Sequence, residues 1–263
     1  TDEKLPVYFW IYGGGWQVGH ASEMEFDGER IARRGIVVVT INYRVNLFGF
    51  TCHPEITAEY PDSPANFGLL DQHKALTWVY KNISNFGGDP EQITIGGQSA
   101  GGGSVINQLA YKKNKPMIKR AVVESGMFIN PFMTMFPSRS LADAEKIGQE
   151  FFEFCGVKNL KEARELSTEF LFKKWDEWGG FPKSAMTWGP VNDGSFICFN
   201  FFDAVEKGLI EVPPLLTGYT PDEFNFGPIG ADKSEEINTI ELALRRLTNS
   251  LEKNGNKNKN FLY

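Results

Sequence analysis

Gly97-Gln98-Ser99-Ala100-Gly101 decides the fold, because it places a serine between small residues where two local patterns meet. The run before it, residues 92–96, is short and β-branched, which predicts a buried strand. The run after it, residues 102–109, predicts the start of a helix. A G-x-S-x-G pattern between a strand and a helix is typical of a turn so sharp that only small neighbours fit. The stretch therefore predicts an α/β fold that presents Ser99 as a nucleophile.

A glycine triplet, Gly13-Gly14-Gly15, follows a second strand-like run at residues 6–12. Glycines after a strand let the backbone approach a substrate closely and direct several N–H groups at one point. Such donors stabilise the oxyanion that forms when a serine attacks a carbonyl carbon. The alternative is a flexible turn without chemistry.

Strand and helix patterns alternate along the chain, which predicts a mostly parallel sheet flanked by helices, with the site at the carboxyl ends of the strands. One helix is expected over residues 66–85, and another begins at Ser140, is capped with Asp143 and stops at Gly156. Strands are expected at residues 6–12, 35–42, 92–96, 120–124 and 213–218.

Eight sequence blocks follow one another along the chain. They are residues 7–16, residues 37–45 with 48–50, Asn66-Phe67-Gly68-Leu69-Leu70-Asp71-Gln72, Phe86-Gly87-Gly88-Asp89-Pro90, the Ser99 stretch, Glu124-Ser125-Gly126, residues 189–194, and Gly218-Tyr219-Thr220-Pro221-Asp222-Glu223. In this order the blocks resemble the type-B carboxylesterase (cholinesterase-like) family of the α/β-hydrolase fold. The series, rather than any one motif, carries the resemblance.

The resemblance implies a serine esterase that needs no cofactor and no metal. It makes Ser99 the nucleophile and Glu223 the acid that orients a histidine base, in the chain order of such hydrolases. An ordinary carboxylate after a strand is the alternative for Glu223. The backbone amides of an oxyanion hole would come from Gly14, Gly15 and Ala100. Trp16 and Trp188 are candidates for the substrate pocket, with an ordinary core position as the alternative for Trp188.

The catalytic base is the main departure from the family. The family places it in a histidine well after the acid, but the histidines of this chain are His20, His53 and His73. We expect His20 near the pocket rim, His53 in a solvated loop and His73 in a packing or surface position on a helix. We therefore interpret the chain as an internal fragment that lacks the early strands and the C-terminal part with the histidine.

Gln98 is a smaller departure, because many family members carry glutamate immediately before the nucleophile. Glutamine keeps the hydrogen bonds of that side chain without the charge that favours cationic substrates. The resemblance then implies small neutral carboxylic esters as substrates. It leaves the acyl and alcohol preference and the oligomeric state open.

Composition, with 41% hydrophobic residues in a chain of 263, agrees with a globular enzyme but does not select one. A formal net charge of −6 and the lack of a Lys/Arg-rich cluster argue against a nucleic-acid partner. No apolar run reaches the length of a membrane span. The three cysteines, Cys52, Cys155 and Cys198, show no evident pairing, which favours a reducing compartment such as the cytoplasm, or a bacterial source.

We expect residues 1–263 to form one partial hydrolase domain, in which residues 128–193 interrupt the strand–helix order and form a cap or pocket wall. Residues 252–263 are a polar tail or a truncated loop. Two alternatives to an enzyme stay open. One is an inactive binding or adhesion module on the same fold, and the other is a truncated remnant that does not fold stably.

Overall fold

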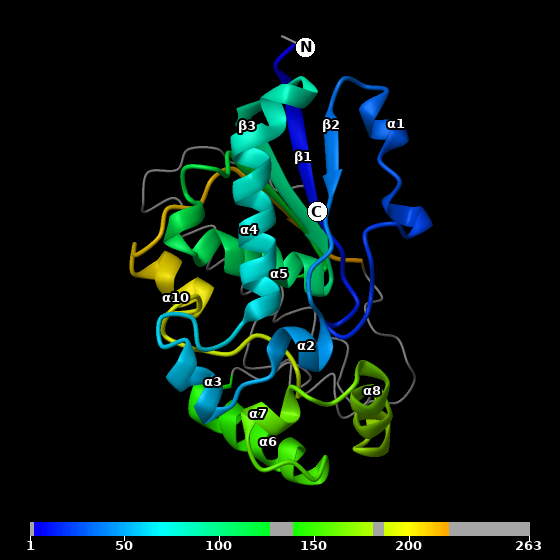
Figure 1. Ribbon diagram of the computed structural model, residues 1–263. Helices are drawn as coiled ribbons and strands as arrows, with labels where there is room; N and C mark the ends of the chain where they lie inside the picture. Colours follow the sequence, from blue (N-terminus) through cyan, green and yellow to red (C-terminus); the bar gives the residue numbers. More distant parts are fainter. Residues whose placement is uncertain (1–2, 127–138, 181–186, 221–263) are drawn as a thin grey trace.

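A parallel sheet organises the chain in the computed structural model, which describes residues 3–126, 139–180 and 187–220. Within these residues five strands pair in the order β2-β1-β3-β4-β5, and every neighbouring pair is parallel. Figure 1 shows the sheet with helices packed around it. The strands are β1 (Leu5–Ile11), β2 (Val37–Thr40), β3 (Gly88–Gln98), β4 (Arg120–Glu124) and β5 (Leu215–Gly218).

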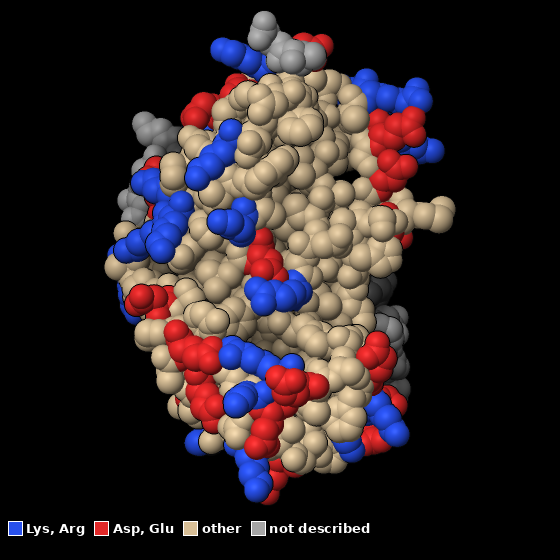
Figure 2. All heavy atoms as spheres, in the orientation of Figure 1, with Lys and Arg blue, Asp and Glu red and all other residues tan. Residues whose placement is uncertain are grey.

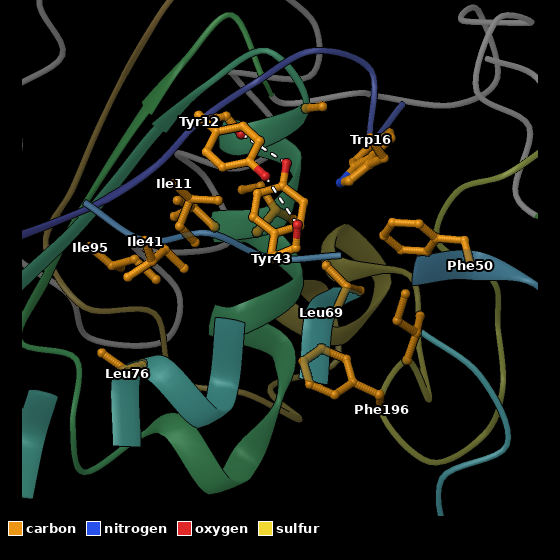
Figure 3. Packing of buried hydrophobic residues seen from close by; sticks show 14 of the residues in the cluster. Ile11, Tyr12, Trp16, Ile41, Tyr43, Phe50, Leu69, Leu76, Ile95 and Phe196 are labelled. Carbon is orange, nitrogen blue, oxygen red and sulfur yellow. Dashed lines mark hydrogen bonds between the residues drawn. The ribbon is translucent and has the colours of Figure 1, made fainter. Parts of the chain in front are cut away.

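The two central strands explain why this sheet is buried. Phe9 and Ile11 of β1 and Ile93 and Ile95 of β3 are fully buried, as expected for parallel strands covered by helices. The register pairs Phe9 with Ile95 and Ile11 with Gly97, so the two strands remain paired as far as the last residue of β1. Figure 3 shows this cluster, with Ile11, Ile95 and Ile41 packed against Leu76 of the neighbouring helix.

Two helices, α4 (Phe67–Asn82) and α5 (Ala100–Ala110), lie against the sheet. Helix α5 begins directly after β3, so its first turn lies at the carboxyl edge of the central strands. Leu69, Leu76 and Val79 line the buried face of α4, as their helical spacing predicts. The other α-helices described are α1 (Glu29–Ala32), α2 (Asn46–Phe50), α3 (Pro54–Glu59), α6 (Leu141–Phe154), α7 (Leu160–Ala163), α8 (Thr168–Glu177) and α10 (Phe201–Glu206), and the 3₁₀ turns are η1 (Met24–Phe26), η2 (Ile83–Phe86) and η3 (Lys112–Asn114).

Helix α6 begins as its capping residues predict. The hydroxyl oxygen of Ser140 accepts a hydrogen bond from the backbone N–H of Asp143, and the same hydroxyl donates to the Asp143 carboxylate at 2.6 Å. Together these bonds satisfy one of the free N–H groups at the helix start and fix where α6 begins.

Charges of both signs share the surface in Figure 2, where acidic and basic side chains interleave over the region of α3, α6 and α7. One of these contacts is the ion pair between Arg164 and Glu59, at 2.6 Å. Exposed pairs of this kind contribute little to stability. Among the helices in the described ranges, none is long and apolar enough to span a membrane.

Candidate active site

Ser99 lies in a strained turn between the last residue of β3 and the first residue of α5. Its backbone has φ 55° and ψ −126°, a combination that costs non-glycine residues about 1–3 kcal/mol. The turn is held by its neighbours: the Ser99 N–H donates to the carbonyl oxygen of Glu124 at 2.9 Å, and the Gly103 N–H donates to the carbonyl of Ser99 at 2.9 Å. We call residues 98–100 the serine turn.

The glycines around the serine turn are required by close backbone packing. A Cβ on Gly101 would lie 2.1 Å from the carbonyl oxygen of Ile11, and a Cβ on Gly97 would lie 2.5 Å from the carbonyl carbon of Gly101. A Cβ on Gly126 would lie 2.5 Å from the Cα of Gly102. Real side chains do not tolerate such distances, so the small residues of the G-x-S-x-G pattern are fixed by backbone contacts on two sides.

The glycine triplet lies directly against the serine turn. A Cβ on Gly13 would meet the carbonyl oxygen of Gln98 at 2.7 Å and the Cβ of Ser99 at 3.2 Å. Gly14 and Gly15 adopt φ of 98° and 65°, a region that suits glycine and few other residues. The fold thus brings two motifs together that are far apart in sequence. We call residues 13–15 the glycine loop.

A reciprocal pair of tyrosines holds the start of the glycine loop. Tyr12 donates its hydroxyl to the carbonyl of Tyr43 at 3.1 Å, and Tyr43 donates its hydroxyl to the carbonyl of Tyr12 at 2.9 Å, as Figure 3 shows. The two rings stack with centroids 4.4 Å apart. Burial raises the pKa of both hydroxyls, so both stay protonated donors at neutral pH. Sequence reasoning did not find Tyr43, which lies after β2.

Trp16 and Trp188, the two predicted pocket residues, are both buried near the glycine loop. Gln17 connects them: its side-chain amide donates to the carbonyl oxygen of Gly15 at 3.1 Å and to that of Trp188. Trp188 packs edge-on against Phe151 of α6, with ring centroids 5.3 Å apart. Trp188 is therefore a core residue that also lies beside the glycine loop.

The three histidines each have a hydrogen-bond partner other than Ser99. His20 is exposed and its Nδ1 lies 3.0 Å from the hydroxyl of Ser22. His73 is half-buried on α4, where its Nδ1 lies 2.6 Å from the side-chain oxygen of Asn114.

The prediction that His53 lies in a solvated loop is wrong. His53 is 6% exposed, stacks on Phe152 of α6 at 4.5 Å and caps α3 by accepting the N–H of Glu55 at Nδ1. The cause is the packing of α6 over this segment. Burial lowers the pKa of His53, against the opposing effect of the Glu55 and Glu145 carboxylates.

Glu223, the predicted triad acid, lies outside the described residues, as do residues 128–138 and 181–186 of the predicted cap and the tail at residues 252–263. Ala100, the third predicted amide donor, is the buried first residue of α5. Within the described ranges no group of three or more His, Cys, Asp or Glu side chains gathers as a metal site would require. The structure thus places the glycine loop against the serine turn through Gly13, and joins Trp16 to α5 through Ser104.

The sequence profile of the Carboxylesterase family matches residues 1–260. The chain is 35% identical to the para-nitrobenzyl esterase of Bacillus subtilis over 254 residues, which are 94% of this chain and 49% of that protein. It is 34% identical to the fumonisin B1 esterase of Sphingopyxis macrogoltabida over 220 residues, which are 83% of this chain and 39% of that protein.

Solved structures give the same result for the fold. A para-nitrobenzyl esterase superposes with a TM-score of 0.76 at 32% identity, covering 93% of this chain and 51% of that one. A carboxylesterase of Geobacillus stearothermophilus superposes with a TM-score of 0.76 at 31% identity, covering 97% of this chain and 52% of that one. The chain spans about half the length of these proteins, or less. These matches confirm the resemblance seen in the sequence: the chain belongs to the carboxylesterase family and has the α/β-hydrolase fold.

Proposed function

We propose that the protein containing this chain hydrolyses small neutral carboxylic esters through an acyl-enzyme on Ser99. The observation that carries the proposal is the contact between the glycine loop and the serine turn, where a Cβ on Gly13 would lie 3.2 Å from that of Ser99. A nucleophile and a loop of backbone donors at one point are what acyl transfer requires. The esterase relatives support the same reaction class.

In the proposed mechanism, the Ser99 hydroxyl oxygen attacks the ester carbonyl carbon while a histidine takes its proton. The carbonyl oxygen becomes an anion that accepts hydrogen bonds from the amides of Gly14, Gly15 and Ala100. Glu223 orients the histidine and stabilises its charged form. The tetrahedral intermediate collapses, and the alcohol leaves with the proton from the histidine. Water then attacks the acyl-enzyme with the same base and releases the acid.

The base is assigned to a histidine outside this sequence. Each of the three histidines in the chain is engaged elsewhere, and a base must reach the serine oxygen at hydrogen-bond distance. The relatives are about twice as long as this chain or more, which leaves room for such a residue.

Neutral substrates are proposed from the residue before the nucleophile. Gln98 is exposed at the end of β3 and carries no charge, so it adds no attraction for a cationic alcohol. The buried indole rings of Trp16 and Trp188 make the protein interior beside the glycine loop apolar, and an apolar surrounding favours uncharged acyl groups.

The test is Ser99→Ala in the complete gene product, with p-nitrophenyl acetate as substrate. Removing a nucleophile of this kind costs on the order of a million-fold in kcat. A fluorophosphonate probe should add its mass to the parent protein and not to the variant. The matched control is Ser84→Ala, at an exposed serine of η2. This variant should keep both the ester turnover and the reaction with the probe. Wild-type turnover by Ser99→Ala would refute the proposal, and a parent protein that neither turns over esters nor reacts with the probe would favour a binding module.

A further inference from the structure

A chain of buried polar side chains runs from Trp16, the residue after the glycine loop, to His73 on α4. We call Ser104, Gln72, Gln108 and Asn114 the buried polar chain, and each of the four is fully buried. Buried polar side chains cost stability unless they are hydrogen-bonded, and these four are hydrogen-bonded to one another. A network of this kind makes the protein interior rigid and can position a part of the site. One of its ends is Trp16 and the other is His73, whose Nδ1 lies 2.6 Å from the side-chain oxygen of Asn114.

Ser104 joins three segments of the fold. Its hydroxyl oxygen accepts one hydrogen bond from the indole Nε1 of Trp16 at 3.0 Å and another from the Nε2 of Gln72 at 3.1 Å. A hydroxyl has two acceptor positions, so these two donors occupy both. Ser104 lies on α5, the helix that begins at the serine turn, and Trp16 directly follows the glycine loop. One hydroxyl therefore links the helix after the nucleophile to the residue after the proposed oxyanion donors.

Trp16 needs to be held, because its backbone adopts φ 60°, which is rare for a bulky residue. Two of its hydrogen bonds hold it on either side. Its carbonyl oxygen accepts the N–H of Asn46 at 2.6 Å, and its indole donates to Ser104. The indole is buried, so the bond to Ser104 is not exchanged with water. The direction in which Trp16 leaves the glycine loop thus depends on its contact with α5.

The rest of the buried polar chain fixes the orientation of Gln72. The side-chain oxygen of Gln72 accepts from the Nε2 of Gln108 at 3.0 Å, and the side-chain oxygen of Gln108 accepts from the Nδ2 of Asn114 at 2.6 Å. Each amide is oriented by its neighbour, so the Gln72 donor points to Ser104. Gln108 also donates to the carbonyl oxygen of Leu69 on α4. Ser104 is therefore an acceptor in a rigid setting.

We propose that Ser104 is a positioning residue for the oxyanion donors, acting through the indole of Trp16. The inference rests on the proposed function, since it assigns the amides of Gly14 and Gly15 to the oxyanion. An amide displaced from its place loses little in substrate binding, because the charge on the carbonyl oxygen develops only in the transition state. The loss then falls on kcat and leaves KM almost unchanged.

The experiment is a double-mutant cycle in the complete gene product, with p-nitrophenyl acetate as substrate. Ser104→Ala removes the acceptor, and Trp16→Phe removes the indole donor while keeping an aromatic ring. Each should lower kcat by about tenfold to a hundredfold with KM within about threefold of the parent value. The double variant should be no slower than the slower single variant, because both changes break the same contact. Ser104→Thr, which restores the hydroxyl, should recover most of kcat.

Asn200→Ala is the matched control, since it removes the side-chain cap of α10 and lowers stability at an exposed position outside the glycine loop and the predicted cap at residues 128–193. It should leave kcat at the parent value. Unchanged kcat in Ser104→Ala, or effects of Ser104→Ala and Trp16→Phe that multiply in the double variant, would overturn the inference. If Ser104→Ala does not fold, Trp16→Phe decides alone: a lower kcat at constant KM supports the inference and an unchanged kcat overturns it.

Failure of the proposed function gives a different result. Ser99→Ala is measured beside the cycle, and its activity reports on the nucleophile whatever Ser104 does. If Ser99→Ala is inactive and Ser104→Ala is fully active, the positioning role of Ser104 is refuted and the proposed function stands. If Ser99→Ala is active, the proposed function is refuted, and the positioning role that rests on it is refuted as well.

Discussion

The serine turn and the glycine loop meet at one point, yet they are held by different kinds of contact. The serine turn is enclosed by backbone, with Gly101 against the carbonyl oxygen of Ile11 and Gly126 against Gly102. The glycine loop is anchored by side chains: Tyr43 holds the residue before it, and Ser104 holds the residue after it. The proposed nucleophile is thus held by backbone contacts, whereas the loop of proposed donors is held by backbone contacts and, at both ends, by hydrogen bonds from or to side chains.

This difference predicts whether a substitution in each half of the site lowers stability or catalytic activity first. Backbone contacts at 2–3 Å leave no room for an added methyl group, so substitutions near Ser99 act first on folding. Side-chain hydrogen bonds can be removed one at a time at about 1 kcal/mol each. Substitutions around the glycine loop should therefore act first on catalysis. Two substitutions at the glycine loop and one beside the serine turn test the comparison.

The largest effect is expected for Gly14→Ala. At φ 98° the new Cβ would lie 2.3 Å from the carbonyl oxygen of Val18, so the loop must move. Displacing one proposed oxyanion donor should lower kcat by about 10²–10³-fold. The backbone strain of a non-glycine residue at this φ should lower the free energy of unfolding by about 1–2 kcal/mol. Steady-state kinetics and urea unfolding of the complete gene product measure the two quantities.

The control for Gly14→Ala is Gly156→Ala, at the end of α6. Gly156 has φ 78° and open space around the position of a Cβ, so the substitution adds backbone strain without a clash. It should cost about 1 kcal/mol of stability and leave kcat unchanged. Equal losses of kcat in both variants would mean that strain alone, and not the position of the loop, sets the rate.

The next effect is expected for Gly101→Ala, on the other side of the comparison. Alanine favours a helix over glycine by about 1 kcal/mol, but its Cβ would lie 2.1 Å from the carbonyl oxygen of Ile11. Overpacking of this kind costs about 3 kcal/mol, so a net loss of about 2 kcal/mol is expected in urea unfolding. Gly218→Ala, with nothing near its Cβ position, should be close to neutral. A variant at Gly101 as stable as the parent would contradict the enclosed turn.

Local patterns predicted most of the elements. The strand at 120–124 is confirmed at both ends, and the one at 6–12 lies one residue earlier, at Leu5–Ile11. Strand β3 begins at Gly88, four residues before its predicted start at 92. The glycine and proline at its start are typical of a turn, but pairing of Leu5 with Gly88 extends the strand. Contacts between distant segments decided this boundary, and no local pattern reports them.

The candidate site divides in the same way. Short motifs predicted Ser99 and the glycine loop, because their chemistry requires small residues within a few positions. The anchors Tyr43, Gln72 and Ser104 come from other segments, and only the fold brings them to the loop. One signal was available: Gln72 stands between Leu69 and Leu76 on the buried stripe of α4. A polar residue on an apolar stripe predicts a buried hydrogen bond, although not its partner.

The smallest effect on kcat is expected when one of the two hydrogen bonds between Tyr12 and Tyr43 is removed. Tyr43→Phe removes the hydroxyl that holds the carbonyl of Tyr12, next to Gly13, whereas Tyr12→Phe removes the hydroxyl that holds the carbonyl of Tyr43. Both should cost about 1 kcal/mol in urea unfolding, since each removes one buried hydrogen bond and keeps the stacked ring. Only Tyr43→Phe frees the residue before the glycine loop, so it should lower kcat several-fold, by about 1 kcal/mol or less of transition-state stabilisation. Equal kcat in the two variants would place the control of the loop at its Trp16 end alone.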